Sequence, residues 1–202
     1  TRGYAPQAGA ATTHLWDISP LPDYPADWKT NGVKVRVCQL RLGHQKRLAG
    51  IKHLNRLENV LAAAELSDAQ QSDSRTHDSQ SQNSQSHSSG IAEGLLMDTA
   101  GNVIEGIRSN LFLVSKGKLV TPDLSRCGVK GVQRDRVMAW ATQHKMPLQV
   151  RNVGLDEVLH ADELFVVNSV IGLWSIRELE QHRLSGFPTA MQIRKSLFEQ
   201  EA

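Results

Sequence analysis

A polar segment from Ser67 to Gly90 sets the strongest limit on how this chain can fold. The segment reads SDAQQSDSRTHDSQSQNSQSHSSG, and Ala69 is its single apolar residue. Such a composition cannot bury enough apolar surface to offset the entropy that ordering costs. We therefore predict a disordered polar insertion over residues 67–90, so that the core is built from the residues on either side.

The residues outside that segment have the composition of an ordinary globular protein. The chain holds 202 residues, of which 40% are hydrophobic and 22% charged, so it can bury a sizeable core. Its formal net charge of +2 is too small to indicate a nucleic acid or a membrane as a partner. No apolar run approaches the ~20 residues of a membrane helix. Because the chain starts at Thr1 rather than at a methionine, we interpret it as a fragment or a processed chain.

The cysteines and histidines show no metal-binding pattern along the chain. Cys38 and Cys127 are isolated, so they indicate neither a disulfide framework nor a zinc motif. His77 and His87 lie in the polar segment, and their spacing fits no tight site. We therefore predict no metal site and expect a reducing, cytoplasmic environment.

Short apolar runs separated by turn residues predict a mixed α+β domain without internal repeats. Residues 33–37 alternate apolar and basic side chains, as a half-buried strand does, and residues 164–167 form a continuous apolar run. Glycine-containing turns at 98–102 and 116–118 predict two hairpins. The predicted strands span residues 12–19, 33–37, 92–97, 103–107, 111–115, 119–121, 148–153 and 164–167. The predicted helices span residues 53–66, 132–144, 155–160 and a last helix from Pro188 towards Gln200.

Lys52 is the first candidate for chemistry. It follows Leu48-Ala49-Gly50-Ile51 and precedes the helix predicted from residue 53. Apolar neighbours can desolvate a lysine and lower its pKa, which turns the amine into a nucleophile that forms an imine. An exposed lysine beside a helix is the alternative, since structural and catalytic lysines look alike in sequence.

Three further segments could bind a ligand. Glu105 lies inside an apolar strand, where a buried carboxylate needs a partner, although an exposed edge position is the alternative. Gly128 and Gly131 precede a helix, so backbone N–H groups there could hold an anion, but an ordinary turn has the same pattern. Asn168-Ser169 follows an apolar strand and offers amide and hydroxyl donors.

A basic stretch between residues 34 and 56 allows three interpretations. It holds no acidic residue before Glu58. Charge runs of this kind usually form a solvated face. A nucleic-acid-binding module is a remote alternative, because interleaved aromatic residues and groove-fitting motifs are missing. The third interpretation is attraction of an anionic small molecule. The basic residues are Lys34, Arg36, Arg41, Lys46, Arg47, Lys52 and Arg56.

These segments resemble one family in the same order along the chain. Residues 48–58, LAGIKHLNRLE, closely resemble the lysine segment of the 4-amino-4-deoxychorismate lyases. Those enzymes fall within the branched-chain and D-amino-acid aminotransferase group of pyridoxal-phosphate enzymes, called fold type IV. The segments VIEG at 103–106, TP at 121–122, GVKGVQR at 128–134 and ADELFVVNS at 161–169 are similar to motifs shared across that group.

The resemblance implies a cofactor, a reaction and a set of site residues. Lys52 would bind pyridoxal 5′-phosphate through an imine and act as the catalytic base, and Glu105 would face the pyridine nitrogen. The implied reaction converts 4-amino-4-deoxychorismate to 4-aminobenzoate and pyruvate in folate biosynthesis. A branched-chain or D-amino-acid aminotransferase is the alternative, because it shares these motifs. The cofactor-binding residues implied are Lys52, Glu105, Gly131, Val132, Asn168 and Ser169.

The resemblance also predicts how the chain is organised. Residues 1–202 correspond to the large cofactor domain of the D-amino-acid aminotransferase-like fold, with residues 1–11 as an inter-domain segment. By the resemblance, we expect the family's smaller N-terminal domain, which precedes the segment similar to Arg2-Gly3-Tyr4, to be missing from this chain. We therefore expect weaker cofactor binding. A homodimer without nucleic-acid or membrane partners is implied as well.

Overall fold

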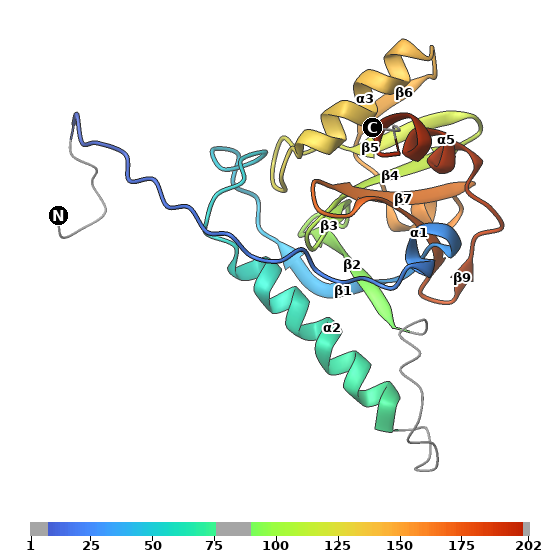
Figure 1. Cartoon of the computed structure of the whole chain (residues 1–202), viewed down its shortest axis with the longest axis horizontal. Coiled ribbons are helices and arrows are strands. Elements are labelled where there is room, and N and C mark those ends of the chain that lie inside the picture. Colours follow the sequence, from blue (N-terminus) through green and yellow to red (C-terminus); the bar gives the residue numbers. More distant parts are fainter. Residues whose placement is uncertain (1–7, 76–89, 200–202) are drawn as a thin grey trace.

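A computed structural model describes residues 8–75 and 90–199 of the chain (Figure 1). Helices and strands are mixed along the sequence, which confirms the predicted α+β class. The helices are α1 (Asp27–Asn31), α2 (Leu57–Arg75), α3 (Val132–Gln143), α4 (Leu155–Leu159) and α5 (Pro188–Leu197). The strands are β1 (Val33–Leu42), β2 (Ile91–Asp98), β3 (Val103–Gly106), β4 (Asn110–Ser115), β5 (Lys118–Pro122), β6 (Leu148–Arg151), β7 (Glu163–Asn168), β8 (Gly172–Leu179) and β9 (His182–Arg183).

The strands of the described residues join into one mixed sheet. Its order is β3-β2-β1-β8-β7-β4-β5-β6, and β9 pairs with β8. The predicted hairpins β2–β3 and β4–β5 are antiparallel, as their short turns require. β1 runs parallel to both of its neighbours, β2 and β8, so distant parts of the sequence meet at the centre of the sheet.

The sheet curls until its two ends are linked. The N–H of Val103 in β3 donates to the carbonyl of Val153, just after β6, at 2.8 Å, and Asn102 forms a bridge with Gly154. The curl encloses an apolar cluster that includes Leu95, Leu113, Val166, Trp174 and Ile176. This link pairs residues at or beside both end strands, which leaves fewer open edges on the sheet.

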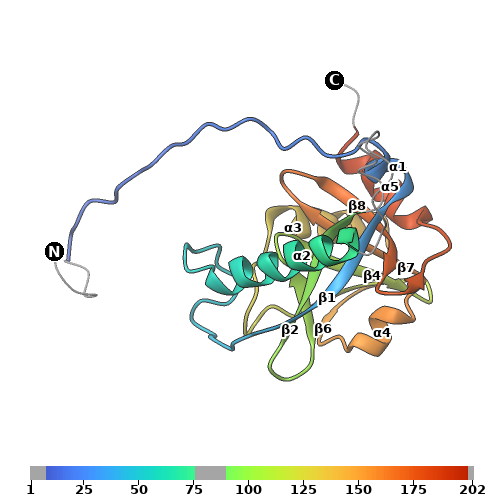
Figure 2. The same cartoon turned by 90° about the horizontal axis from the view of Figure 1, so that it is seen from below.

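Three helices cover the outer faces of the curled sheet (Figures 1 and 2). α2 packs on β1 and β2 through Ala62 and Leu66. α3 and α5 pack together over β7, where Val137, Trp140 and Ile193 meet the sheet. None of the helices within residues 8–75 and 90–199 combines the length and the hydropathy that a membrane span needs.

Two local predictions are wrong. Residues 12–19 form no strand but run as an extended segment away from the body (Figures 1 and 2), because no strand lies beside them. α2 begins four residues after its predicted start and continues to Arg75, so the first nine residues of the predicted disordered insertion are helical. Once a helix is nucleated, each added residue loses its own backbone freedom but gains one hydrogen bond, so polar residues can continue the helix. Residues 76–89 and the segment 2–4 lie outside the described residues.

Candidate active site

Glu105 lies on β3 with its carboxylate buried, 3% exposed. Its Oε2 accepts hydrogen bonds from the N–H of Val129 at 2.8 Å and from Nδ2 of Asn110 at 3.5 Å. Burial raises the pKa of Glu105 from 4.5 to about 7, while the Val129 N–H and the charges of Arg56 and Lys52 act in the lowering direction. The carboxyl group can therefore hold or release a proton near neutral pH.

The glycine turn, residues 128–132, is built tightly against Glu105. Gly128 has φ +82°, and a Cβ there would lie 2.8 Å from Ile104 and 2.9 Å from Leu124. Only glycine accepts this conformation without strain and leaves room for those side chains. The turn is thus fixed by its neighbours in the core, and the predicted ligand-binding backbone at 128–132 has a defined shape.

The first turn of α3 faces solvent at the end of the glycine turn. The N–H of Gly131 donates to Oδ1 of Asn110 at 3.1 Å, so this predicted phosphate donor already has a partner. Val132, the other predicted donor, is 69% exposed, and no side chain caps the helix. Unpaired N–H groups and the dipole at such a helix start favour an anion.

Lys52 lies in the lysine loop, residues 43–56, which connects β1 to α2. Its side chain is exposed, and Leu48, Ile51 and Leu54 are exposed as well. The predicted desolvation of Lys52 by these apolar neighbours is therefore wrong for this chain. The loop is covered on one side only, so its apolar side chains point into water instead of around the amine.

Arg56 holds the backbone on both sides of Lys52. Its Nη2 donates to the carbonyl of Ile51 at 2.6 Å, and its Nε donates to the carbonyl of His53 at 3.3 Å. The planar guanidinium suits two acceptors at once, which a lysine cannot match. Arg56 thereby fixes the loop conformation that carries the Lys52 side chain. Sequence reasoning placed Arg56 in a basic stretch but did not predict this role.

Backbone hydrogen bonds join the lysine loop to the glycine turn. The N–H of Gly50 donates to the carbonyl of Gly128 at 2.8 Å, and the N–H of Lys130 donates to the carbonyl of Gly50 at 3.1 Å. These two bonds form a short parallel bridge between Gly50 and Val129. The fold therefore brings Lys52, Glu105 and the glycine turn into one region, although the three segments are far apart in sequence.

The Asn168-Ser169 segment forms the turn after β7. Oδ1 of Asn168 accepts the N–H groups of Val170 and Ile171, both at 2.8 Å, and its Nδ2 donates to the carbonyl of Arg108 at 3.0 Å. Its amide is thus occupied in shaping the turn. Ser169 is exposed, so its hydroxyl remains the better candidate for a ligand contact.

Comparisons with known proteins agree with this architecture. Residues 80–179 match the family model described as Amino-transferase class IV. An aminodeoxychorismate lyase of Vibrio harveyi is 34% identical over 172 residues, which are 85% of this chain and 56% of that protein. The crystal structure of 4-amino-4-deoxychorismate lyase from Pseudomonas aeruginosa matches with a TM-score of 0.77 and 40% identity, over 90% of this chain and 60% of that one.

This chain has the class IV aminotransferase fold. The predicted resemblance to the lyases is confirmed. A probable branched-chain-amino-acid aminotransferase of Thermotoga maritima is also similar, with 36% identity over 88 residues, 44% of this chain and 32% of that protein. The chain spans about 56–60% of the two lyases to which it is similar, so it corresponds to part of such a protein.

A second buried carboxylate lies near Glu105. Glu93 on β2 is fully buried; Ser109 Oγ donates to its Oε2 at 2.8 Å, and Arg108 Nε lies 3.8 Å away. Burial raises the pKa of Glu93, against the opposing charge of Arg108. Sequence reasoning missed Glu93, although a charged residue within the apolar strand 91–98 was a signal that a partner is needed.

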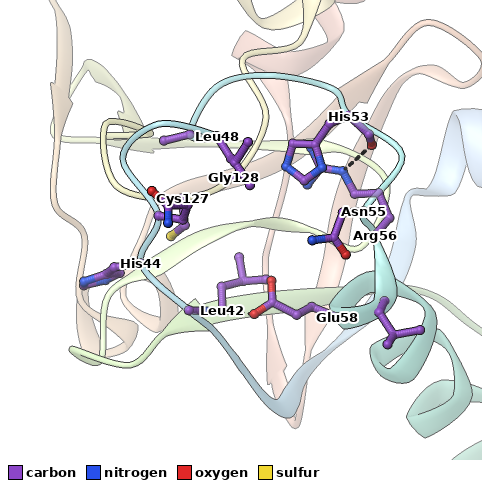
Figure 3. A pocket seen from close by; sticks show the side chains of 13 residues that line it. Leu42, His44, Leu48, His53, Asn55, Arg56, Glu58, Cys127 and Gly128 are labelled. Atoms are coloured by element: carbon purple, nitrogen blue, oxygen red, sulfur yellow. Dashed lines mark hydrogen bonds between the residues drawn. The ribbon is translucent and has the colours of Figure 1, made fainter. Parts of the chain in front are cut away.

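A pocket of about 410 Å³ opens between the lysine loop and residues 127–128 (Figure 3). Arg56 and Gly128 contribute to its wall, but none of the six cofactor-binding residues implied by the resemblance does. The pocket therefore lies beside the predicted cofactor site. Its lining residues are Leu42, Gly43, His44, Gln45, Leu48, Ala49, His53, Asn55, Arg56, Leu57, Glu58, Cys127 and Gly128.

Proposed function

We propose that this chain is the cofactor-binding domain of a pyridoxal-phosphate-dependent aminodeoxychorismate lyase. Its reaction would convert 4-amino-4-deoxychorismate to 4-aminobenzoate and pyruvate, a step of folate biosynthesis in the cytoplasm. The observation that carries the proposal is the convergence of a lysine, a buried carboxyl group and an open helix start in a fold shared with such a lyase. The lysine segment at 48–58 adds the resemblance that is specific to the lyases.

The residues present fit pyridoxal phosphate. The uncapped first turn of α3 at Val132 offers N–H groups to a phosphate, and the exposed Ser169 hydroxyl lies in a turn that could add a donor. The buried Glu105 carboxyl group, whose pKa burial raises to about 7, can form a hydrogen bond with a ring nitrogen. Lys52 is accessible to an aldehyde because its side chain is exposed. The assigned cofactor-binding residues are Lys52, Glu105, Gly131, Val132, Asn168 and Ser169, with Asn168 and Gly131 acting through the turns that they hold.

The chain's own residues then have distinct tasks. When bound, pyridoxal phosphate supplies an aldehyde that captures amines and a ring that accepts electrons. Lys52 would hold the cofactor covalently and, once free, accept the proton from the amine-bearing carbon of the substrate and return it to the leaving fragment. Glu105 would hold a proton at the ring nitrogen. Arg56 keeps the Lys52 backbone in place during these transfers.

Covalent capture at Lys52 tests the cofactor assignment. Pyridoxal phosphate added to the protein should give a visible absorbance band, and borohydride reduction followed by peptide mapping should place the label on Lys52. Lys46→Ala, on the same exposed loop, is the matched control and should leave the label unchanged. A label on another lysine, or an equal label in Lys52→Ala, would contradict the assignment.

Product analysis separates the lyase from the alternative. A branched-chain aminotransferase remains the second candidate because a similar stretch of 88 residues occurs in the probable enzyme of Thermotoga maritima. The lyase releases pyruvate and 4-aminobenzoate from 4-amino-4-deoxychorismate without an amino acceptor. Transfer of an amino group from leucine or a D-amino acid to a keto acid, without pyruvate release, would instead support the aminotransferase.

The proposal includes a homodimer, which the resemblance implies. Leu57, Val60 and Leu61 are exposed on α2 and offer an apolar surface for such a contact. Light scattering coupled to gel filtration measures the mass directly. A monomer at micromolar concentration would contradict this part of the proposal without affecting the cofactor assignment.

A further inference from the structure

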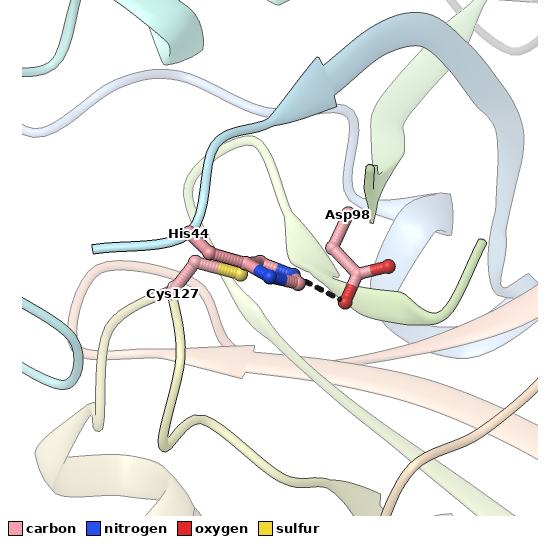
Figure 4. A group of neighbouring side chains, drawn as sticks. All are labelled: His44, Asp98 and Cys127. Atoms are coloured by element: carbon pink, nitrogen blue, oxygen red, sulfur yellow. Dashed lines mark hydrogen bonds and ion pairs between the residues drawn. The ribbon is translucent and has the colours of Figure 1, made fainter. Parts of the chain in front are cut away.

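The side chains of His44, Asp98 and Cys127, all of residue types that can bind a metal, lie close together (Figure 4). His44 lies at the start of the lysine loop, Asp98 ends β2, and Cys127 precedes the glycine turn. One ligand atom from each, a ring nitrogen, a carboxylate oxygen and a sulfur, lies within 4.8 Å of the others. Among the described residues, nitrogen, oxygen and sulfur ligand atoms thus lie together in this one group. Their spacing along the sequence, 54 and 29 residues, gives no metal motif.

The backbone already holds the three segments together. The N–H of Thr99 donates to the carbonyl of Leu42 at 3.3 Å, which ties the Asp98 turn to the His44 segment. The N–H of Gln45 donates to the carbonyl of Arg126 at 2.8 Å, which ties the His44 segment to Cys127. The donors are thus preorganised, so a ligand does not have to assemble the site from separate loops.

Asp98 is oriented by its own tight turn. Its Oδ1 accepts the N–H groups of Ala100 at 3.0 Å and of Asn102 at 2.8 Å. Nδ2 of Asn102 donates to Oδ2 at 2.9 Å, and Nε2 of His44 lies 2.9 Å from the same oxygen. Hydrogen bonds of this kind around a carboxylate fix the direction of a metal ligand.

We propose that His44, Asp98 and Cys127 bind a divalent cation of the zinc type. Zinc accepts imidazole, carboxylate and thiolate ligands at about 2.0–2.3 Å, which sets donor pairs roughly 3.3–3.6 Å apart. The three donor atoms need only small rotations to reach that spacing from their separation within 4.8 Å. A single thiolate with one nitrogen and one oxygen ligand favours zinc over magnesium or calcium, which take oxygen ligands.

Access and a fourth ligand position come from the pocket. His44 and Cys127 line its wall, and the His44 side chain is 30% exposed, so an ion and a water molecule can enter. On binding, the cation displaces the proton of the Cys127 thiol to solvent and takes the place of the hydrogen bond between His44 and Asp98. The ion then links the lysine loop to the residue before the glycine turn.

Cobalt titration of the chelator-treated protein tests the site directly. Co²⁺ should saturate at one equivalent and produce the near-ultraviolet charge-transfer band of a cobalt–thiolate bond, which Zn²⁺ should abolish by displacement. Cys127→Ser should lose the band, and His44→Ala should weaken binding at least roughly tenfold. Cys38→Ser, the other buried cysteine, and His160→Ala, an exposed histidine on the segment after α4, are matched controls that should bind as the parent does.

A measurement on the unaltered chain keeps the test independent of variant folding. Zinc should slow alkylation of Cys127 by iodoacetamide, mapped by mass spectrometry, and should leave Cys38 at its metal-free rate. A band that persists in Cys127→Ser, cobalt binding that does not saturate, or equal protection of both cysteines would overturn the proposal. None of these readouts depends on pyridoxal phosphate, so the result is separate from that of the proposed function.

Discussion

Glu105 and Lys52 come from two regions that the fold holds very differently. Glu105 is buried and accepts the Val129 N–H, and Gly128, the first residue of the glycine turn, packs against Ile104 and Leu124. The lysine loop lies on the surface, and its conformation depends on Arg56 and on the bridge at Gly50. The comparison shows that folding alone constructs the carboxylate side of the site, while the lysine side has few contacts that would resist movement. Substitutions in the two regions should therefore affect different properties.

The largest expected effect is the loss of cofactor attachment in the exposed region. Lys52→Ala should abolish covalent capture of pyridoxal phosphate, because no other amine occupies its position in the loop. Its free energy of unfolding should change by less than about 0.5 kcal/mol, since exposed side chains contribute little to stability. Peptide mapping and urea denaturation measure the two quantities. A large loss of stability would show that the lysine loop is part of the folded core after all.

Gly128→Ala should have the largest effect on stability in the buried region. The positive φ costs about 1–2 kcal/mol for a residue with a Cβ, and overpacking against Ile104 and Leu124 adds about 1–3 kcal/mol. Gly101→Ala is the matched control, because Gly101 has φ +84° with nothing within 4 Å of a Cβ. Equal losses in urea denaturation would mean that the glycine turn relaxes away from the core.

Glu105→Gln should stabilise the cofactor-free protein at alkaline pH. The pKa of Glu105 rises from 4.5 to about 7 on folding, so its stabilising contribution is complete below pH 4.5 and is lost as pH rises through 7. The amide has no charge to bury and keeps an oxygen for the Val129 N–H. At about 1.4 kcal/mol per pKa unit, the variant should gain about 3 kcal/mol at pH 8 and little near pH 4.

The pH dependence of that gain distinguishes charge burial from altered packing. Glu199→Gln, just beyond α5, is a control on an exposed carboxylate and should give no such dependence. A gain that is the same at pH 4 and pH 8 would exclude ionisation of Glu105 as its cause. Urea denaturation at each pH gives the free energies needed for the comparison.

The smallest expected effect comes from replacing Arg56, which holds the backbone of the lysine loop. Arg56→Lys keeps the positive charge near Glu105. A lysine amine lacks the planar guanidinium that donates to the carbonyl groups of Ile51 and His53 at the same time. The rate of pyridoxal phosphate attachment should fall about tenfold, because Lys52 is held less well in position. The free energy of unfolding should fall by about 1 kcal/mol or less. An unchanged attachment rate would show that the bridge at Gly50 is sufficient to fix the loop.

Local sequence patterns predicted the hairpins, β7 and the elements that hold the candidate site. The turn at 98–102 and the glycines at 128 and 131 carry their own conformational signal, so β2, β3 and the start of α3 were predicted closely. Strand β8 was missed because its Gly172–Leu179 sequence mixes apolar and charged residues, and its identity depends on pairing with β1 and β7.

The burial and the contacts that were predicted wrongly or missed depend on how other segments pack over each residue. Apolar residues around Lys52 indicated a desolvated amine, but Leu48, Ile51 and Leu54 are exposed and do not cover it. Glu93 stands out in the sequence as a charge in an apolar strand, but its full burial depends on β1, β3 and α2, which pack around β2. Arg56 acts on carbonyl groups three and five residues before it, and such side-chain to backbone contacts depend on a loop conformation that no periodic pattern encodes.

The position of β1 between β2 and β8 has a consequence for how the chain folds. β1 spans residues 33–42, yet one of its two partners ends at Leu179. Pairing across such a sequence distance costs loop-closure entropy before it gains contacts, so folding should be slow for a domain of this size. During synthesis, one edge of β1 stays unpaired until residue 179 has left the ribosome, and that edge is a template for aggregation. Expression at low temperature or with chaperones should therefore raise the yield of folded protein.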